Sequence, residues 1–94
     1  MSVLYIFSKS NNKMIHKIQN IHGIVYIVDG MNKNFIEEIN NVLKQIVEEK
    51  KFPFSSIYLK FPVFASNHIS SAMENFDIKP KNIMKKKNEI VIEF

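Results

Sequence analysis

The stretch GIVYIVDGMNKNFIEEINNVLKQIVEEKKFPFSSIYLKF, residues 23–61, decides the fold of this chain. Residues 24–28 are a run of five apolar residues, which is typical of a strand covered on both faces. Over residues 35–50 the apolar residues recur with a helical period, and residues 57–61 alternate like a half-buried strand. The stretch therefore predicts two parallel strands joined by a helix.

The ends of this predicted helix are marked by residues suited to helix boundaries. Asn34 is expected to cap the first turn, with Glu37 three residues later as the second half of an Asn-led capping box. Lys50 and Lys51 suit the C-terminal end of the helix dipole, and Pro53 stops the helix. Both boundaries agree with the periodicity.

The residues before this stretch carry weaker patterns. Residues 3–7 are a second continuous apolar run, which predicts a strand beside residues 24–28 in the middle of the sheet. Residues 9–22 are predicted to hold a short helix that Gly23 ends, while a hairpin turning at residues 11–12 is the alternative. The helix prediction rests on four apolar residues at i, i+1, i+4 and i+7: Met14, Ile15, Ile18 and Ile21.

The residues after the stretch complete the predicted domain. Residues 66–76 are expected to form a further helix that Ser66 caps, and residues 90–94 a closing strand with one wet face. The predicted fold is a single small α/β domain over residues 1–94, with a four-stranded mixed sheet in the order β-α-β-α-β-(α)-β and two to three helices. The first two strands are expected at the centre, and the last strand antiparallel at an edge.

Composition limits the classes of function. The chain has 94 residues and no cysteine, which excludes disulfides and thiolate metal sites. No apolar run approaches the ~20 residues of a membrane span, and the first residues lack the pattern of a secretory signal. We expect a cytoplasmic protein that binds no metal or cofactor and does not enter a membrane.

Polar residues follow the predicted strands at what should be one shared edge of the sheet, where ligands of open α/β sheets bind. This strand-end edge consists of Ser8, Ser10, Asp29, Asn32, Ser66, Asn67 and His68. Asp29, Ser66 and His68 contain the residue types of a hydrolytic triad, but no G-x-S-x-G elbow surrounds any serine. The histidines also lack the spacing of a metal site. We therefore assign no catalytic residue, and a small enzyme working at this edge is our second alternative.

The net charge of +4 comes from thirteen lysines and no arginine, and five lysines fall within residues 79–87. They are Lys79, Lys81, Lys85, Lys86 and Lys87. A basic loop here could bind a nucleic-acid backbone, although the missing arginines weaken base recognition. The other interpretation is a solvated loop that discourages edge-to-edge pairing of the last strand.

Aromatic residues and prolines flank the strand predicted at residues 57–61. Large exposed aromatic side chains mark partner-binding or self-association surfaces, whereas buried ones belong to the core. The candidate partner-binding residues are Phe52, Phe54, Tyr58 and Phe64.

The layout of the chain resembles two known families. Residues 23–76 are similar to a STAS domain of the anti-sigma-factor antagonist type, with a strand, a capped amphipathic helix, a strand and a Ser-bearing loop that opens another helix. The chain also resembles the Alba-like group of small basic nucleic-acid binders in its βαβαββ order and its basic stretch before the last strand. The resemblances imply a regulatory module in the first case and a nucleic-acid binder in the second.

We expect a small non-enzymatic protein-interaction or regulatory module, whose partner is another protein or a second copy of the chain. A lysine-rich protein that binds nucleic-acid backbone is the first alternative.

Overall fold

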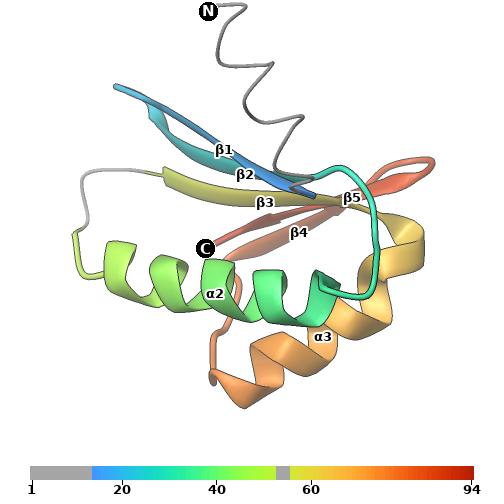
Figure 1. Cartoon of the computed structure of the whole chain (residues 1–94). Helices are drawn as coiled ribbons and strands as arrows, with labels where there is room; N and C mark the ends of the chain where they lie inside the picture. The colour runs from blue at the N-terminus through green and yellow to red at the C-terminus, as the bar shows by residue number, and fades with distance from the viewer. Residues whose placement is uncertain (1–13, 53–55) are drawn as a thin grey trace, which may run out of the picture.

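A mixed sheet with two helices on one of its faces forms the protein, as Figure 1 shows. The computed structural model describes residues 14–52 and 56–94, and in them the sheet has five strands. The small single α/β domain predicted from the sequence is confirmed. The elements in chain order are β1 (Ile15–Asn20), β2 (Gly23–Val28), α2 (Phe35–Glu49), β3 (Ser56–Pro62), the 3₁₀ turn η1 (Val63–Ala65), α3 (Ser66–Asn75), β4 (Asn82–Lys85) and β5 (Glu89–Glu93).

The β2–α2–β3 unit is the part that the sequence predicted best. β2 and β3 are parallel neighbours, with Ile24 opposite Ile57 and Tyr26 opposite Leu59. α2 joins them and ends at Glu49, one residue before its predicted end. The apolar residues of α2 lie on one side of the helix, and this side packs against the sheet because it is thereby removed from water. Phe35, Ile39, Leu43 and Ile46 are among the buried residues of this side.

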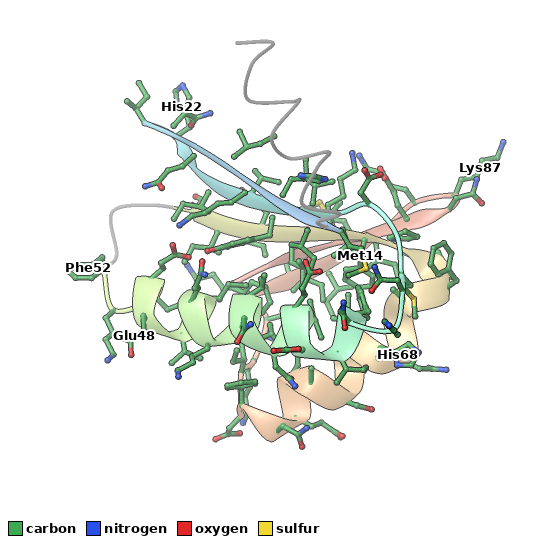
Figure 2. All side chains as sticks on the ribbon, viewed as in Figure 1. Met14, His22, Glu48, Phe52, His68 and Lys87 are labelled. Atoms are coloured by element: carbon green, nitrogen blue, oxygen red, sulfur yellow. The ribbon has the colours of Figure 1, made fainter. Side chains whose placement is uncertain are left out.

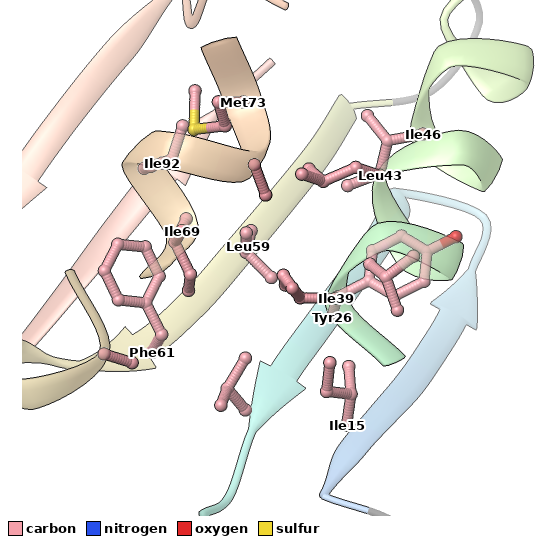
Figure 3. Packing of buried hydrophobic residues seen from close by; sticks show 14 of the residues in the cluster. Ile15, Tyr26, Ile39, Leu43, Ile46, Leu59, Phe61, Ile69, Met73 and Ile92 are labelled. Carbon is pink, nitrogen blue, oxygen red and sulfur yellow. The ribbon is translucent and has the colours of Figure 1, made fainter. Parts of the chain in front are cut away.

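The hydrophobic core lies between the helices and one face of the sheet (Figure 3). Alternate residues of β2, β3 and β5 are buried, and α3 closes the core with Ile69, Ala72 and Met73. Each fully buried large apolar side chain contributes roughly 1.5–3 kcal/mol to stability. The strand residues of this core are Ile15, Ile24, Tyr26, Val28, Ile57, Leu59, Phe61, Ile90 and Ile92.

The helix predicted within residues 9–22 is wrong, because residues 15–20 form strand β1. β1 pairs antiparallel with β2, and this hairpin turns at residues 21–22. The alternative hairpin turn at residues 11–12 lies outside the described residues. The side-chain Oδ1 of Asn20 accepts a hydrogen bond from the His22 N–H at 2.7 Å, which tightens the turn at residues 21–22. The helix prediction failed because it rested on the spacing of only four apolar residues. Such a short pattern is a weaker determinant than the strand pairing that β2 provides.

The predicted order of the strands also needs correction. The strand predicted at residues 3–7 lies outside the described residues, but its expected place beside β2 is taken, since β1 and β3 occupy the two sides of β2. The strand order is β1-β2-β3-β5-β4. The last strand is antiparallel to β3 as predicted, yet β4 covers its other side, so β5 is not an edge.

β4 forms within the lysine-rich stretch that the sequence analysis treated as a loop. Residues 82–85 pair with β5, placing Ile83 opposite Ile92 and Met84 opposite Val91. A four-residue hairpin strand escapes the sequence pattern because both of its faces are exposed, which removes the alternation expected of a half-buried strand. From β2 to β5 the element order is therefore β-α-β-α-β-β.

Asn34 is the N-cap residue of α2 as predicted, but the capping side-chain hydrogen bond expected at each helix is absent, and the cap predicted at Ser66 is wrong. Asn34 makes no side-chain hydrogen bond to the first turn of α2, and its own N–H donates instead to Oδ1 of Asn32 at 2.7 Å. Ser66 is the first residue of α3 rather than its cap, and its Oγ donates to the Val63 carbonyl at 2.7 Å. In each case the polar side chain near the helix start stabilises the preceding turn.

Gly23 provides a test of the hairpin and of its contact with β3. It has a φ of 152°, and a Cβ there would collide with the Ser56 carbonyl oxygen on the neighbouring strand. We expect Gly23→Ala to lower the free energy of unfolding by about 1–3 kcal/mol, measured by urea denaturation. Gly30→Ala is the matched control, because no atom lies within 4 Å of its added methyl group. Equal stability of the two variants would contradict the described register.

Candidate functional site

The sheet has one covered face and one open face. Residues directly opposite each other on neighbouring strands point to the same side, so the strand register sorts the side chains into two sets. The buried set faces α2 and α3, and no helix of the described residues lies over the other set. Two rows cross this open face: Ile18, Val25, Tyr58, Glu93 and Asn82 in one, and His16, Ile27, Lys60, Val91 and Met84 in the other.

Six of these residues form what we call the open-face patch: Ile18, Val25, Ile27, Tyr58, Met84 and Val91. Ile18 is 51% exposed and Met84 is 37% exposed, while the other four are half-buried by their neighbours in the sheet. The patch therefore crosses the sheet from the edge strand β1 to the edge strand β4. Lys60 and Glu93 stand among these side chains, and exposed apolar groups bordered by polar residues are typical of a binding face.

Two pairs of polar side chains border the patch at the carboxyl ends of β2 and β3. His16 Nε2 lies 3.6 Å from Asp29 Oδ2, and Lys60 Nζ lies 3.5 Å from Glu89 Oε2. A shallow depression of about 450 Å³ opens beside them, and Lys86 contributes to its lining. An apolar centre with a charged, solvated rim is the usual anatomy of a protein interface.

The structure does not assemble the predicted strand-end edge into one site. Asp29 pairs with His16, Asn32 takes part in the turn before α2, and Ser66 bonds to η1. The ring of His68 packs edge-on against Phe35, with centroids 6.1 Å apart. In residues 14–52 and 56–94 no hydrogen bond or ion pair joins Asp29, Ser66 and His68. Asn67 is exposed on α3, and Ser8 and Ser10 lie outside the described residues.

The predicted aromatic residues do not lie on one surface. Phe52 follows the end of α2, near the amino end of β3, whereas Phe64 follows the carboxyl end of β3; both are exposed. Figure 2 shows Phe52 and His68 at opposite ends of the helical layer. Tyr58 stands between them on the open face, and Phe54 lies outside the described residues. The four aromatic residues therefore contribute one member, Tyr58, to the open-face patch.

The five predicted lysines are exposed but divided between the two ends of β4. Lys79 and Lys81 precede the strand, and the Lys81 N–H donates to the Glu93 carbonyl at 2.7 Å. Lys85 ends the strand, and Lys86 and Lys87 form the turn into β5, at the far right of Figure 2. A strand of this length separates the groups by about 13 Å. Only the three lysines at the turn are close enough together to act as one cationic site.

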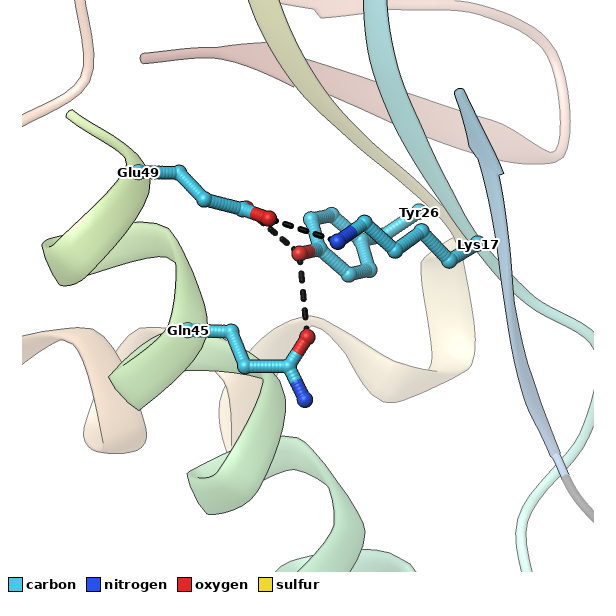
Figure 4. A network of polar contacts seen from close by, with 4 residues as sticks. All are labelled: Lys17, Tyr26, Gln45 and Glu49. Atoms are coloured by element: carbon cyan, nitrogen blue, oxygen red, sulfur yellow. Dashed lines mark hydrogen bonds and ion pairs between the residues drawn. The ribbon is translucent and has the colours of Figure 1, made fainter. Parts of the chain in front are cut away.

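A polar network attaches the β1–β2 hairpin to α2 (Figure 4). The buried Tyr26 donates its hydroxyl proton to Glu49 Oε1 at 2.5 Å, and the same hydroxyl lies 3.2 Å from Gln45 Oε1. Lys17 Nζ binds the other oxygen of Glu49 at 2.6 Å and sits 5.6 Å from the centre of the Tyr26 ring. Burial, and after it the hydrogen bond and charge of Glu49, raise the pKa of Tyr26 well above its ordinary value. The network therefore holds Tyr26 neutral, which suits a structural role.

The residues that sequence reasoning missed are those that complete the open-face patch. Ile18 was placed on a helix, and residues 24–28 were expected to be covered on both faces, so Val25 and Ile27 were assigned to the core. Met84 was placed in a loop. Only Val91 carried a usable signal, since it alternates with Ile90 and Ile92 in the predicted last strand.

No protein-family model, curated protein or solved structure matches this chain. The described part of the chain holds no group of three or more His, Asp or Glu side chains that could bind a metal ion. Among the described helices, none is long and apolar enough to cross a membrane. The candidate site therefore rests on the geometry of the sheet alone.

The network of Tyr26 predicts a distinct pH dependence. Because its pKa is raised in the folded state, the contribution of Tyr26 to stability is complete below the unfolded pKa of about 10 and is lost as the pH rises above it. We expect Tyr26→Phe to lower the free energy of unfolding by about 1 kcal/mol at neutral pH, measured by urea denaturation. The variant should also lose less stability than the unaltered chain when the pH is raised from neutral to strongly alkaline. Tyr58→Phe is the control, because Tyr58 is half-buried on the other face. If Tyr26→Phe lost as much stability at alkaline pH as the unaltered chain, this role would be contradicted.

Proposed function

We propose that this protein is a small non-enzymatic interaction module that binds a protein partner through its open-face patch. The observation that carries the proposal is the one-sided layering of the domain, with both α2 and α3 on the same face of the sheet. Among the described residues no helix covers the other face of the sheet, and covering the apolar side chains of the patch stabilises a complex by roughly 25 cal/mol per Å².

The charged rim supports a protein partner over a small-molecule ligand. A small-molecule site is usually a concave and mostly apolar pocket with a few polar groups that fix the ligand. The depression beside the patch is open to solvent, and charged side chains, among them Asp29, Lys60 and Glu89, line it together with apolar ones. The patch itself lies on a sheet surface, which suits a broad macromolecular contact.

Two adjacent residues of β4 allow a matched test. Met84 points to the open face and Ile83 to the helical side, and both are exposed, at 37% and 58%. Met84→Lys and Ile83→Lys therefore add the same charge to the same strand on opposite faces. We expect the protein that co-purifies with the unaltered chain from its native host to be lost with Met84→Lys and retained with Ile83→Lys, measured by quantitative mass spectrometry. Loss of the partner in both variants, or in neither, would contradict the proposal.

The same purification tests the second candidate, a contact with nucleic-acid backbone through Lys85, Lys86 and Lys87. Three lysines at one turn favour this candidate, because each can neutralise a phosphate of the backbone. Nucleic acid would then co-purify with the chain, and raising the salt concentration would release it. Release of the bound material by nuclease treatment, with no protein partner left, would replace the first proposal by the second.

A further inference from the structure

The two edges of the sheet are protected very differently. β4 is four residues long and is flanked by Lys81, Lys86 and Lys87, a pattern that prevents edge-to-edge pairing. β1 is six residues long and carries one lysine, Lys17, whose ammonium group is already bound to Glu49. Within residues 14–52 and 56–94 no strand pairs with the outer side of β1, and this edge is long and nearly uncharged, which are the properties of a strand that accepts another strand.

The backbone groups available on this edge follow from the pairing of β1 with β2. The Asp29 N–H donates to the Met14 carbonyl, so residues 14 and 29 form a hydrogen-bonded pair. Hydrogen-bonded and non-hydrogen-bonded pairs alternate along an antiparallel ladder. The N–H and C=O groups of Ile15, Lys17 and Gln19 therefore point away from β2, toward the free edge.

From these observations we propose that two copies of this chain pair antiparallel through β1, forming a continuous ten-stranded sheet. The proposal does not rest on the function proposed above. In such a pair the outward backbone groups of Ile15, Lys17 and Gln19 must face the same groups of the second copy, so the numbers of opposing residues have an even sum. A sum of 34 would place Lys17 opposite Lys17 of the second copy, which repels, whereas a sum of 36 places Ile18 opposite Ile18 and Lys17 opposite Gln19.

The second register also satisfies the backbone. Lys17 and Gln19 both offer outward N–H and C=O groups, so the Lys17–Gln19 pairs on the two sides of the symmetry axis are hydrogen-bonded pairs. Ile18 meets its counterpart as a non-hydrogen-bonded pair, in which the side chains approach most closely. Ile18 is 51% exposed in the single chain and becomes covered by this contact. The two open faces then lie on the same side and join across the Ile18 pair.

The side of α2 near this edge is compatible with a second copy. A groove between β1 and α2 is lined by Lys17, Asn41, Lys44, Gln45, Glu48 and Glu49, with both signs of charge present. A two-fold axis would bring the α2 helices of the two copies to face each other across this groove in opposite directions. Lysine of one copy can then approach glutamate of the other.

The mass of the full chain in solution tests the proposal, measured by sedimentation at increasing concentration. We expect a reversible dimer, and Ile18→Lys should raise its dissociation constant at least about tenfold because it places like charges opposite each other. Ile83→Lys, at the opposite edge of the sheet and outside the open-face patch, is the control and should leave the dimer intact. Circular dichroism shows whether each variant is folded.

Cysteine cross-linking tests the register, since the chain has no cysteine of its own. In the proposed pair the Ile18 Cα atoms are ~4.5 Å apart, within the range that a disulfide spans. Ile18→Cys should therefore form a disulfide-linked dimer under mild oxidation much faster than Gln19→Cys, whose counterpart is two residues further along. A monomer at every concentration, or equal cross-linking of the two cysteine variants, would overturn the proposal.

Discussion

The burial of a single face of the sheet is the constraint on which the rest of this structure depends. Every second residue of β2, β3 and β5 packs against α2 and α3. Since a helix needs a flat apolar surface beneath its own apolar stripe, the two helices and this face fix each other's position. The parallel pairing of β2 with β3 follows from the crossover through α2, and the antiparallel hairpins at both sides extend the sheet without adding a second layer.

One-sided burial explains why the polar features of the domain are structural. Tyr26 belongs to the buried face, yet its hydroxyl reaches the margin of α2, where Gln45 and Glu49 lie within hydrogen-bond distance of it. Lys17 completes the contact from β1, so the hairpin is held to the helix where apolar packing ends. A buried hydroxyl without such a partner would cost about 1–3 kcal/mol. The network therefore contributes by avoiding that cost and by fixing the angle between hairpin and helix.

The sequence predicted an element correctly where a long apolar pattern lay within that single helix or strand. The fifteen residues of α2 and the alternation of β3 carry their own period, so the central unit could be predicted with its boundaries. β1 and β4 could not, because one faces water along most of its length and the other along all of it, which leaves no period to detect. The uninterrupted apolar run of β2 was read as burial on both faces, whereas Val25 and Ile27 are in fact half-buried on the open face.

The candidate site could be predicted only in part for the same reason. Tyr58 was identified because it is an aromatic residue on a strand that alternates, but its neighbours on the open face come from four other strands. Which residues share a face across several strands depends on the strand order and register, and neither is encoded locally. Asp29, Ser66 and His68 were grouped from their places after the predicted strands, whereas in the structure Asp29 pairs with His16, Ser66 bonds to the Val63 carbonyl and His68 packs against Phe35.

Substitutions at neighbouring positions of β3 test most directly whether only one face of the sheet belongs to the core. Leu59 is buried under the helices and Tyr58 is half-buried on the open face, so Leu59→Asn and Tyr58→Asn place the same polar group on opposite sides of one strand. The measurement is the free energy of unfolding of each variant in urea. One-sided burial predicts a loss of about 3 kcal/mol or more, or outright unfolding, for Leu59→Asn and a loss of about 1 kcal/mol for Tyr58→Asn. Equal losses at the two positions would contradict it.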